Sequence, residues 1–210
     1  EFDDNGNLKN NYQINGIAKD GKINFFNRNS LDAINFVFKI QKNKFQLNDL
    51  HLKIENENFQ LPETIIVKKS NEYSVSGKLI SNQITLQEDK IYNYINLDNL
   101  NFKIKEVDFL SENNFNFLIN NKFKIKGLNV DSKINLVNLE IENNLNLQNF
   151  FPKIKNKFFL KDNQLQIKYK KNSLDIIGSG NIFLQEKPDI IEYKIIKNQN
   201  NLNFDVELDI

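Results

Sequence analysis

Tyr73-Ser74-Val75-Ser76-Gly77-Lys78-Leu79 is one of four versions of a phrase that recurs along this chain. Each version has an aromatic or aliphatic residue, a polar one, an aliphatic one and a further residue, then a glycine. The others are Tyr12-Gln13-Ile14-Asn15-Gly16-Ile17, Phe123-Lys124-Ile125-Lys126-Gly127-Leu128 and Leu174-Asp175-Ile176-Ile177-Gly178. The glycines lie roughly 50 to 60 residues apart, and self-similarity at such a period is typical of repeat proteins. We therefore expect a single repetitive domain over residues 1–210, built from strands.

Alternation of apolar and polar residues supports strands throughout the chain. In Ile34-Asn35-Phe36-Val37-Phe38-Lys39-Ile40, two phenylalanines and two isoleucines fall on one side. Residues 50–54, 100–104 and 202–210 alternate in the same way. Because successive side chains of a strand point to opposite faces, this pattern predicts sheets with one apolar and one polar face. The fold class we expect is all-β, a long antiparallel meander of roughly twelve to fifteen strands of about five to nine residues.

Turn signals separate these runs. Asp20-Gly21 between alternating residues predicts a hairpin within residues 16–26. Ser81-Asn82, Asp131-Ser132, Lys171-Asn172 and residues 198–201 are further expected turns.

The apolar face could be hidden in two ways. Two sheets could stack as a β-sandwich with a filled core. Alternatively, one sheet could curl into a U-shaped repeating β-groove whose interior is apolar, since a long one-faced array must hide its apolar side. Alternation does not distinguish these arrangements, because both require it.

Composition argues against several functions. The 28 basic and 27 acidic residues leave a net charge of +1, so we expect no nucleic-acid partner. The absence of cysteine excludes disulfides and thiolate chemistry. Roughly a fifth of the residues are asparagine, which we interpret mainly as solvated surface.

Candidate catalytic residues are scarce. His51 is the only histidine, and no nucleophile motif accompanies it. Gly178-Ser179-Gly180 lacks the spacing of a nucleophile elbow and is better interpreted as a strand bend. Acidic pairs such as Glu88-Asp89 lack the pattern of a calcium loop and are expected in solvated turns. We therefore expect no enzyme, no catalytic residue, no metal site and no cofactor.

Three features together resemble AsmA-like bacterial envelope proteins of the YhdP and TamB type. They are the glycine phrases, the phrase at residues 48–54 and 98–104, and the run from Phe150-Phe151-Pro152-Lys153-Ile154 through Gly178-Ser179-Gly180 to Tyr193. The resemblance implies a U-shaped β-groove in the periplasm of a Gram-negative bacterium, anchored in the inner membrane by a segment outside this sequence. It also implies a part in phospholipid transport between inner and outer membranes, and in outer-membrane integrity.

On this hypothesis the chain is an internal fragment of a longer protein, because it lacks methionine and stops in mid-pattern at Ile210. Its partners are phospholipid acyl chains and, at the ends of the full-length chain, inner- and outer-membrane proteins. The alternative is a structural or adhesive β-repeat domain that binds a protein or glycan through its polar face. The candidate lipid-groove residues are Ile34, Phe36, Phe38, Ile40, Leu50, Leu52, Ile54, Leu100, Phe102, Ile104, Phe115, Phe117, Phe204 and Val206.

Overall fold

A computed structural model describes residues 2–6, 9, 12–25, 29–54, 57–94, 102–143, 149, 155–199 and 201–209. The described part of the chain is almost entirely strand, with one short helix. The elements are β1 (Gln13–Phe25), β2 (Asn29–Gln41), β3 (Lys44–Ile54), β4 (Glu57–Lys69), β5 (Glu72–Gln87), α1 (Glu88–Tyr94), β6 (Phe102–Asn120), β7 (Ile125–Asn143), β8 (Lys157–Lys170), β9 (Ser173–Phe183), β10 (Asp189–Asn198) and β11 (Asn201–Asp209).

The expected all-β meander is confirmed. The eleven strands form one sheet in chain order, and the strand pairs with a described register are antiparallel. β1 and β11 stand at the two ends of this order, so the sheet is not closed. Among the described residues there is no second sheet of the kind that the sandwich alternative requires.

The strands are fewer and longer than expected, because several expected turns lie inside strands. Asp20-Gly21 is not a hairpin turn: β1 runs through it, and the pairing with β2 shifts there. Ser81-Asn82 lies within β5 and Asp131-Ser132 within β7. Lys171-Asn172 does join β8 to β9, and β10 ends at Asn198 while β11 begins at Asn201. Left-handed residues serve β-bulges as well as turns, and local sequence does not distinguish the two.

The bulges are built from residues with positive φ. Asp20, Ala33 and Asp162 have φ of 52°, 50° and 53°, and the strand pairing shifts beside each of them. Pro62, which cannot donate a ladder hydrogen bond, likewise lies within the register shift between Gln60 and Thr64. An extra residue in one strand bends that strand and increases its twist.

Asparagine side chains brace two of these bulges. Asn35 Nδ2 donates to the Ala33 carbonyl at 2.7 Å, and Asn35 Oδ1 accepts from the Asp20 amide at 3.0 Å. Asn163, which is only 1% exposed, donates through Nδ2 to the carbonyls of Lys161 at 2.9 Å and Asn181 at 3.0 Å. These two asparagines therefore have structural roles and are exceptions to the interpretation of asparagine as mainly solvated surface.

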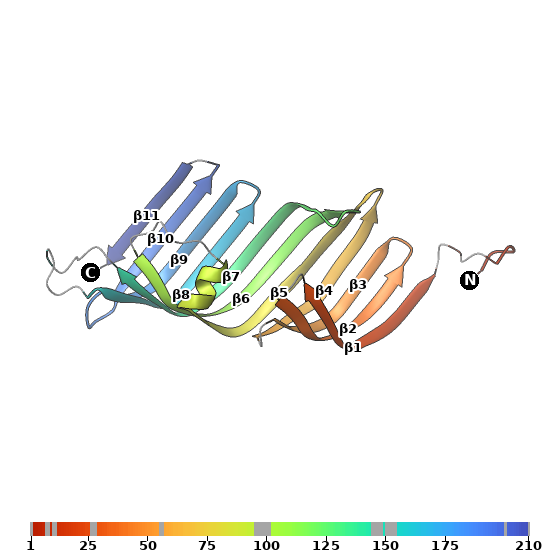
Figure 1. Cartoon of the computed structure of the whole chain (residues 1–210). Helices are drawn as coiled ribbons and strands as arrows, with labels where there is room; N and C mark the ends of the chain where they lie inside the picture. Colours follow the sequence, from red (N-terminus) through yellow and green to blue (C-terminus); the bar gives the residue numbers. More distant parts are fainter. Residues whose placement is uncertain are drawn as a thin grey trace. The chain divides into compact units, whose positions relative to one another are not determined.

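The chain divides into two compact units. Unit 1 comprises Glu1–Ser81 and Glu112–Val130, and unit 2 comprises Asn82–Ser111 and Asp131–Ile210. β1 to β4 lie side by side in unit 1, and β8 to β11 lie side by side in unit 2 (Figure 1). Buried apolar side chains include Ile34, Leu50 and Val75 in unit 1. In unit 2 they include Ile84, Ile91, Leu136, Ile141, Ile182 and Ile191.

Candidate functional site

In unit 1, large apolar side chains gather on one face of the sheet, which we call the apolar face of the unit. Directly paired residues share a face, and Ile14 pairs with Ile40 while Ala18 pairs with Phe36. Ile40 in turn pairs with Phe45 of β3. The Phe36 and Phe38 rings lie 6.2 Å apart, and the Phe115 and Phe117 rings stack at 6.0 Å. The face is therefore a continuous surface of rings and aliphatic chains.

Three of the four repeated glycines lie beneath aromatic rings of a neighbouring strand. A Cβ on Gly16 would stand 2.3 Å from the Phe38 ring, one on Gly77 2.8 Å from the Phe115 ring, and one on Gly178 2.3 Å from the Tyr193 ring. Each glycine thus leaves room for a ring to lie close to the backbone, an arrangement used to fix strand register. The fourth, Gly127, has nothing within 4 Å and a φ of +58°, so there the backbone conformation favours glycine.

Unit 2 also has an apolar face, and β11 is the last described strand on it. Phe204 pairs with Ile195, Val206 with Tyr193 and Leu208 with Ile191. In β11 the side chains remain open to solvent: Phe204 is 64% exposed and Val206 53%. We call Leu202, Phe204, Val206 and Leu208 the β11 apolar row. Its exposure shows that none of the described residues covers it.

The predicted groove residues that the structure describes differ in exposure. Ile34 and Leu50 are buried, and the β11 residues Phe204 and Val206 are exposed. Leu100 lies outside the described residues. The remaining ones are half-buried: Phe36, Phe38, Ile40, Leu52, Ile54, Phe102, Ile104, Phe115 and Phe117. The prediction omitted Ile14, Leu202 and Leu208, although each stands in an alternating run that could have revealed it.

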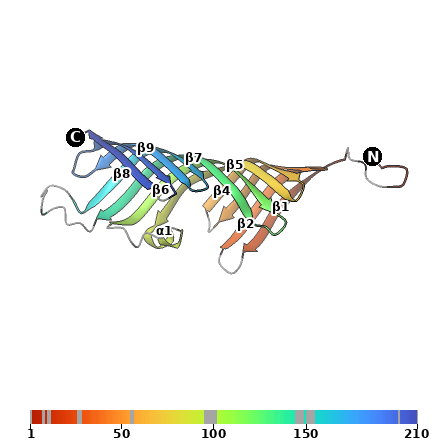
Figure 2. The same ribbon diagram turned by 90° about the horizontal axis from the view of Figure 1, so that it is seen from above.

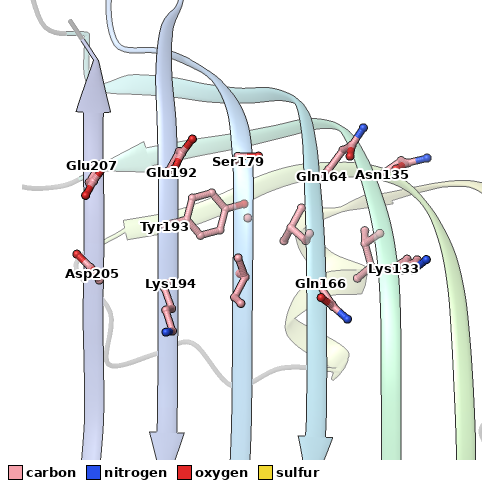
Figure 3. A pocket seen from close by; sticks show the side chains of 14 residues that line it. Lys133, Asn135, Gln164, Gln166, Ser179, Glu192, Tyr193, Lys194, Asp205 and Glu207 are labelled. Atoms are coloured by element: carbon pink, nitrogen blue, oxygen red, sulfur yellow. The ribbon is translucent and has the colours of Figure 1, made fainter.

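The opposite, polar face of unit 2 contains a hollow of about 630 Å³ across β7 to β11 (Figure 3). Its rim carries charges of both signs together with amide and hydroxyl groups. The labelled residues that line it are Lys133, Asn135, Gln164, Gln166, Ser179, Glu192, Tyr193, Lys194, Asp205 and Glu207. Tyr193 pairs with Gly178 and Val206, so its ring, which extends from β10 across β9, belongs to the apolar face, and burial raises the pKa of its phenol. The charged, amide and hydroxyl groups that line the polar side of the hollow can hydrogen-bond a hydroxylated ligand.

An ion pair joins the first residue of α1, a helix visible in Figure 2, to the neighbouring strand β6. Lys105 Nζ of β6 lies 2.8 Å from Glu88 Oε2 and 3.1 Å from Glu142 Oε2. Glu88, and then Glu142, raise the pKa of Lys105, while Lys105 lowers the pKa of Glu142. Glu88 and Asp89 were expected in a solvated turn; instead they begin α1, where acidic side chains favour the helix N-terminus. The charges of Glu88, Lys105 and Glu142 are therefore paired within the fold.

Groups suited to catalysis or metal binding are sparse in the described part of the chain. His51 is exposed in β3, opposite Asn35 on one side and Gln60 on the other. Among the described residues, no three or more His, Asp or Glu side chains gather closely enough to hold a metal ion. None of the described helical residues forms a segment long and apolar enough to cross a membrane.

Comparison of the chain with protein-family models, with curated proteins and with solved structures gave no match.

Proposed function

We propose that this chain is a lipid-carrying segment of an AsmA-like envelope protein. Its apolar face holds phospholipid acyl chains in the periplasm, between the inner and outer membranes. The observation that carries the proposal is the exposed β11 apolar row, with Phe204 at 64% and Leu208 at 43%. Contiguous exposed apolar surface of this kind marks an interaction site on a protein.

The energetics favour an acyl chain as the occupant. Moving a chain of about sixteen carbons through water costs on the order of 12 kcal/mol, at about 0.8 kcal/mol per methylene. An apolar surface of mixed rings and aliphatic chains lowers this cost without fixing the lipid in one position. The head group stays in water, so no specific polar contact is required.

The proposal includes curling of the sheet around its apolar face into a U-shaped groove. The bulges at Asp20, Ala33 and Asp162 bend individual strands, as a U-shaped groove requires. The rings above Gly16, Gly77 and Gly178 lie close to the backbone, which leaves more room inside such a groove.

Mass spectrometry of organic extracts from the detergent-free protein tests this function. We expect stoichiometric phospholipid with the parent chain and with Glu207→Gln, which alters only the opposite face. Phe204→Asp combined with Val206→Asp should reduce bound lipid at least about fivefold, since it places charges among acyl chains. Equal lipid content in all three folded proteins, or none in the parent, would contradict the proposal.

The hollow on the polar face of unit 2 favours a second candidate, the binding of a glycan or protein by a structural β-repeat domain. A glycan should contact its amides and carboxylates, among them Gln164, Gln166 and Glu192. Lipid-free, folded protein that binds glycans on an array, and loses this binding on Gln166→Ala, would favour this candidate over the lipid carrier.

A further inference from the structure

Lysines gather at one end of the strands of unit 1. Three consecutive hairpins turn there: residues 42–43 join β2 to β3, residues 70–71 join β4 to β5, and residues 121–124 join β6 to β7 (Figure 1). The Lys68 amide donates to the Asn43 carbonyl at 2.8 Å, so the first two turns are neighbours. Lys126 Nζ lies 2.6 Å from Glu72 Oε1, which brings the third turn beside the second. Residues 42–44, 68–72 and 120–126, which we call the basic hairpin end, contain Lys42, Lys44, Lys68, Lys69, Lys122, Lys124 and Lys126.

The positive charge of the basic hairpin end is poorly neutralised. Glu72 is the one carboxylate in these three segments, and it pairs with Lys126. The other six lysines form no ion pair with the described residues, and all of them except Lys44 are exposed. Several carboxylates of the same unit lie in mid-strand instead, among them Asp20 of β1 and Glu63 of β4. The net charge of +1 therefore conceals a local excess of positive charge.

Phe123, in the third of these turns, is the most exposed large apolar side chain of the described residues, at 85%. Its φ is +56°, a conformation that disfavours a bulky residue. Asn120 holds the turn in this shape: its carbonyl accepts from the Phe123 amide at 2.9 Å. Its Oδ1 accepts from the amides of Lys122 at 2.9 Å and Lys124 at 3.0 Å. The phenyl ring gives the fold neither burial nor a favourable backbone conformation, which points to a role in binding.

We propose that the basic hairpin end docks on an anionic phospholipid surface, with Phe123 and Ile125 inserted between the head groups and the acyl chains. Ile125 is 57% exposed. Lysine ammonium groups are attracted to the phosphates of such a surface, and neighbouring apolar side chains enter its boundary region. The two apolar residues alternate with Lys122, Lys124 and Lys126, so one turn offers both kinds of contact. This inference concerns a membrane surface and does not depend on lipid bound to the apolar face.

A nucleic acid would also attract lysines through its phosphates, but it fits this end less well. Proteins that bind single strands combine a basic surface with aromatic side chains on which successive bases stack. The exposed apolar residues of the third turn are one ring and one aliphatic side chain, and the aliphatic Ile125 offers no stacking surface. The boundary region of a bilayer accommodates both side chains.

Flotation of the full chain with vesicles tests the docking. We expect binding to phosphatidylcholine vesicles that contain about one third phosphatidylglycerol, weakening as salt rises, and at least about tenfold weaker binding to phosphatidylcholine alone. Lys69→Gln combined with Lys122→Gln should weaken binding to the anionic vesicles at least about fivefold. Lys19→Gln combined with Lys53→Gln is the same charge change at exposed positions outside the basic hairpin end. This control should stay within about twofold of the parent.

Phe123 distinguishes insertion from charge attraction alone. Phe123→Asn suits a positive φ, so it should keep or raise the urea midpoint while weakening vesicle binding at least about threefold. Phe123→Trp provides a single tryptophan, which brominated phosphatidylcholine in the anionic vesicles should quench. Equal binding to neutral vesicles, equal losses in the two lysine variants, parent-level binding by Phe123→Asn or an unquenched tryptophan would each overturn the proposal. Lysine-dependent binding of a fluorescent oligouridine that exceeds vesicle binding would overturn it in favour of a nucleic acid.

Discussion

The strands β1 to β4 and the strands β8 to β11 have the same kind of apolar face but differ in how they bend. The pairings of β1 with β2 and of β2 with β3 shift register in mid-strand, whereas those of β9 with β10 and of β10 with β11 do not. In the second group the shift is confined to Lys161–Gln164 of β8. Alternation thus determines which face is apolar, while isolated left-handed residues determine where a strand bends.

The bulge of β8 at Asp162 is more tightly enclosed than the bulge of β1 at Asp20. A Cβ on Gly180 would stand 2.6 Å from Asn163 Cα, a backbone atom that cannot move alone. We expect Gly180→Ala to lower the free energy of unfolding by about 3 kcal/mol, through overpacking. Gly21→Ala in β1, whose Cβ would meet Ile34 Cβ at 3.2 Å, should cost about 1 kcal/mol. Urea unfolding measures both, and equal costs would contradict the contrast.

The two bracing asparagines provide the next comparison. Asn163→Ala removes two hydrogen bonds in a position that is 1% exposed, and should cost about 2 kcal/mol. Asn35→Ala acts at a half-buried position and should cost about 1 kcal/mol. Chemical denaturation of the two variants checks this order. A larger loss for Asn35→Ala would show that the N-terminal bulges carry more of the stability.

Rings over glycine should behave alike in both regions. Gly16→Ala displaces the Phe38 ring and Gly178→Ala displaces the Tyr193 ring, each at about 1 to 2 kcal/mol. Adding Phe38→Leu or Tyr193→Leu should make the double variants less destabilised than the sum of the singles, because each pair is in contact. Gly127→Ala meets no atom within 4 Å and should lose about 1 kcal/mol from its φ of +58° alone. Strict additivity in both double-mutant cycles would exclude the ring contact as the cause.

The smallest effects concern the carboxylates. Lys105 is the main cause of the lowered pKa of Glu142, whereas two partners lower the pKa of Asp32, first a hydrogen bond from the Ser30 hydroxyl and then Lys22. A lowered folded-state pKa stabilises the fold above the unfolded-state value, and this contribution is lost as the pH falls through the folded-state value. In NMR titrations, Lys105→Met should return the pKa of Glu142 most of the way to its ordinary value. Lys22→Met should return the pKa of Asp32 only part of the way to its ordinary value. A larger recovery for Asp32 than for Glu142 would contradict these causes.

The all-β meander, and which side chains of each strand share a face, could be predicted from the sequence. Successive side chains of a strand point to opposite faces, so alternating apolar and polar residues separate onto the two faces of the sheet. Phe36, Phe38 and Ile40 fall on one face as predicted. The strand boundaries were not predictable in this way. Asp20-Gly21 has the same local sequence whether the chain turns or bulges, and only the pairing with β2 decides between them.

The roles of particular residues also depended on contacts between distant positions. Gly178 belongs to the repeated glycine phrase, but the sequence does not show why glycine is needed there: the Tyr193 ring of the next strand occupies the space of a Cβ. Asn163 resembles the many solvated asparagines, yet it is buried because Gly180 leaves space beside it. The hollow on the polar face is lined by residues from five strands, so no local sequence motif predicts it.

The most direct test of the lipid-carrying face uses the absence of tryptophan from the chain. Phe204→Trp places a single tryptophan in the β11 apolar row, and Asp205→Trp places one on the opposite face of the same strand. Brominated fatty acid should quench the tryptophan at position 204 saturably and far more strongly than the one at position 205. Equal quenching at both positions, or stronger quenching at position 205, would contradict the assignment of the apolar face to acyl chains.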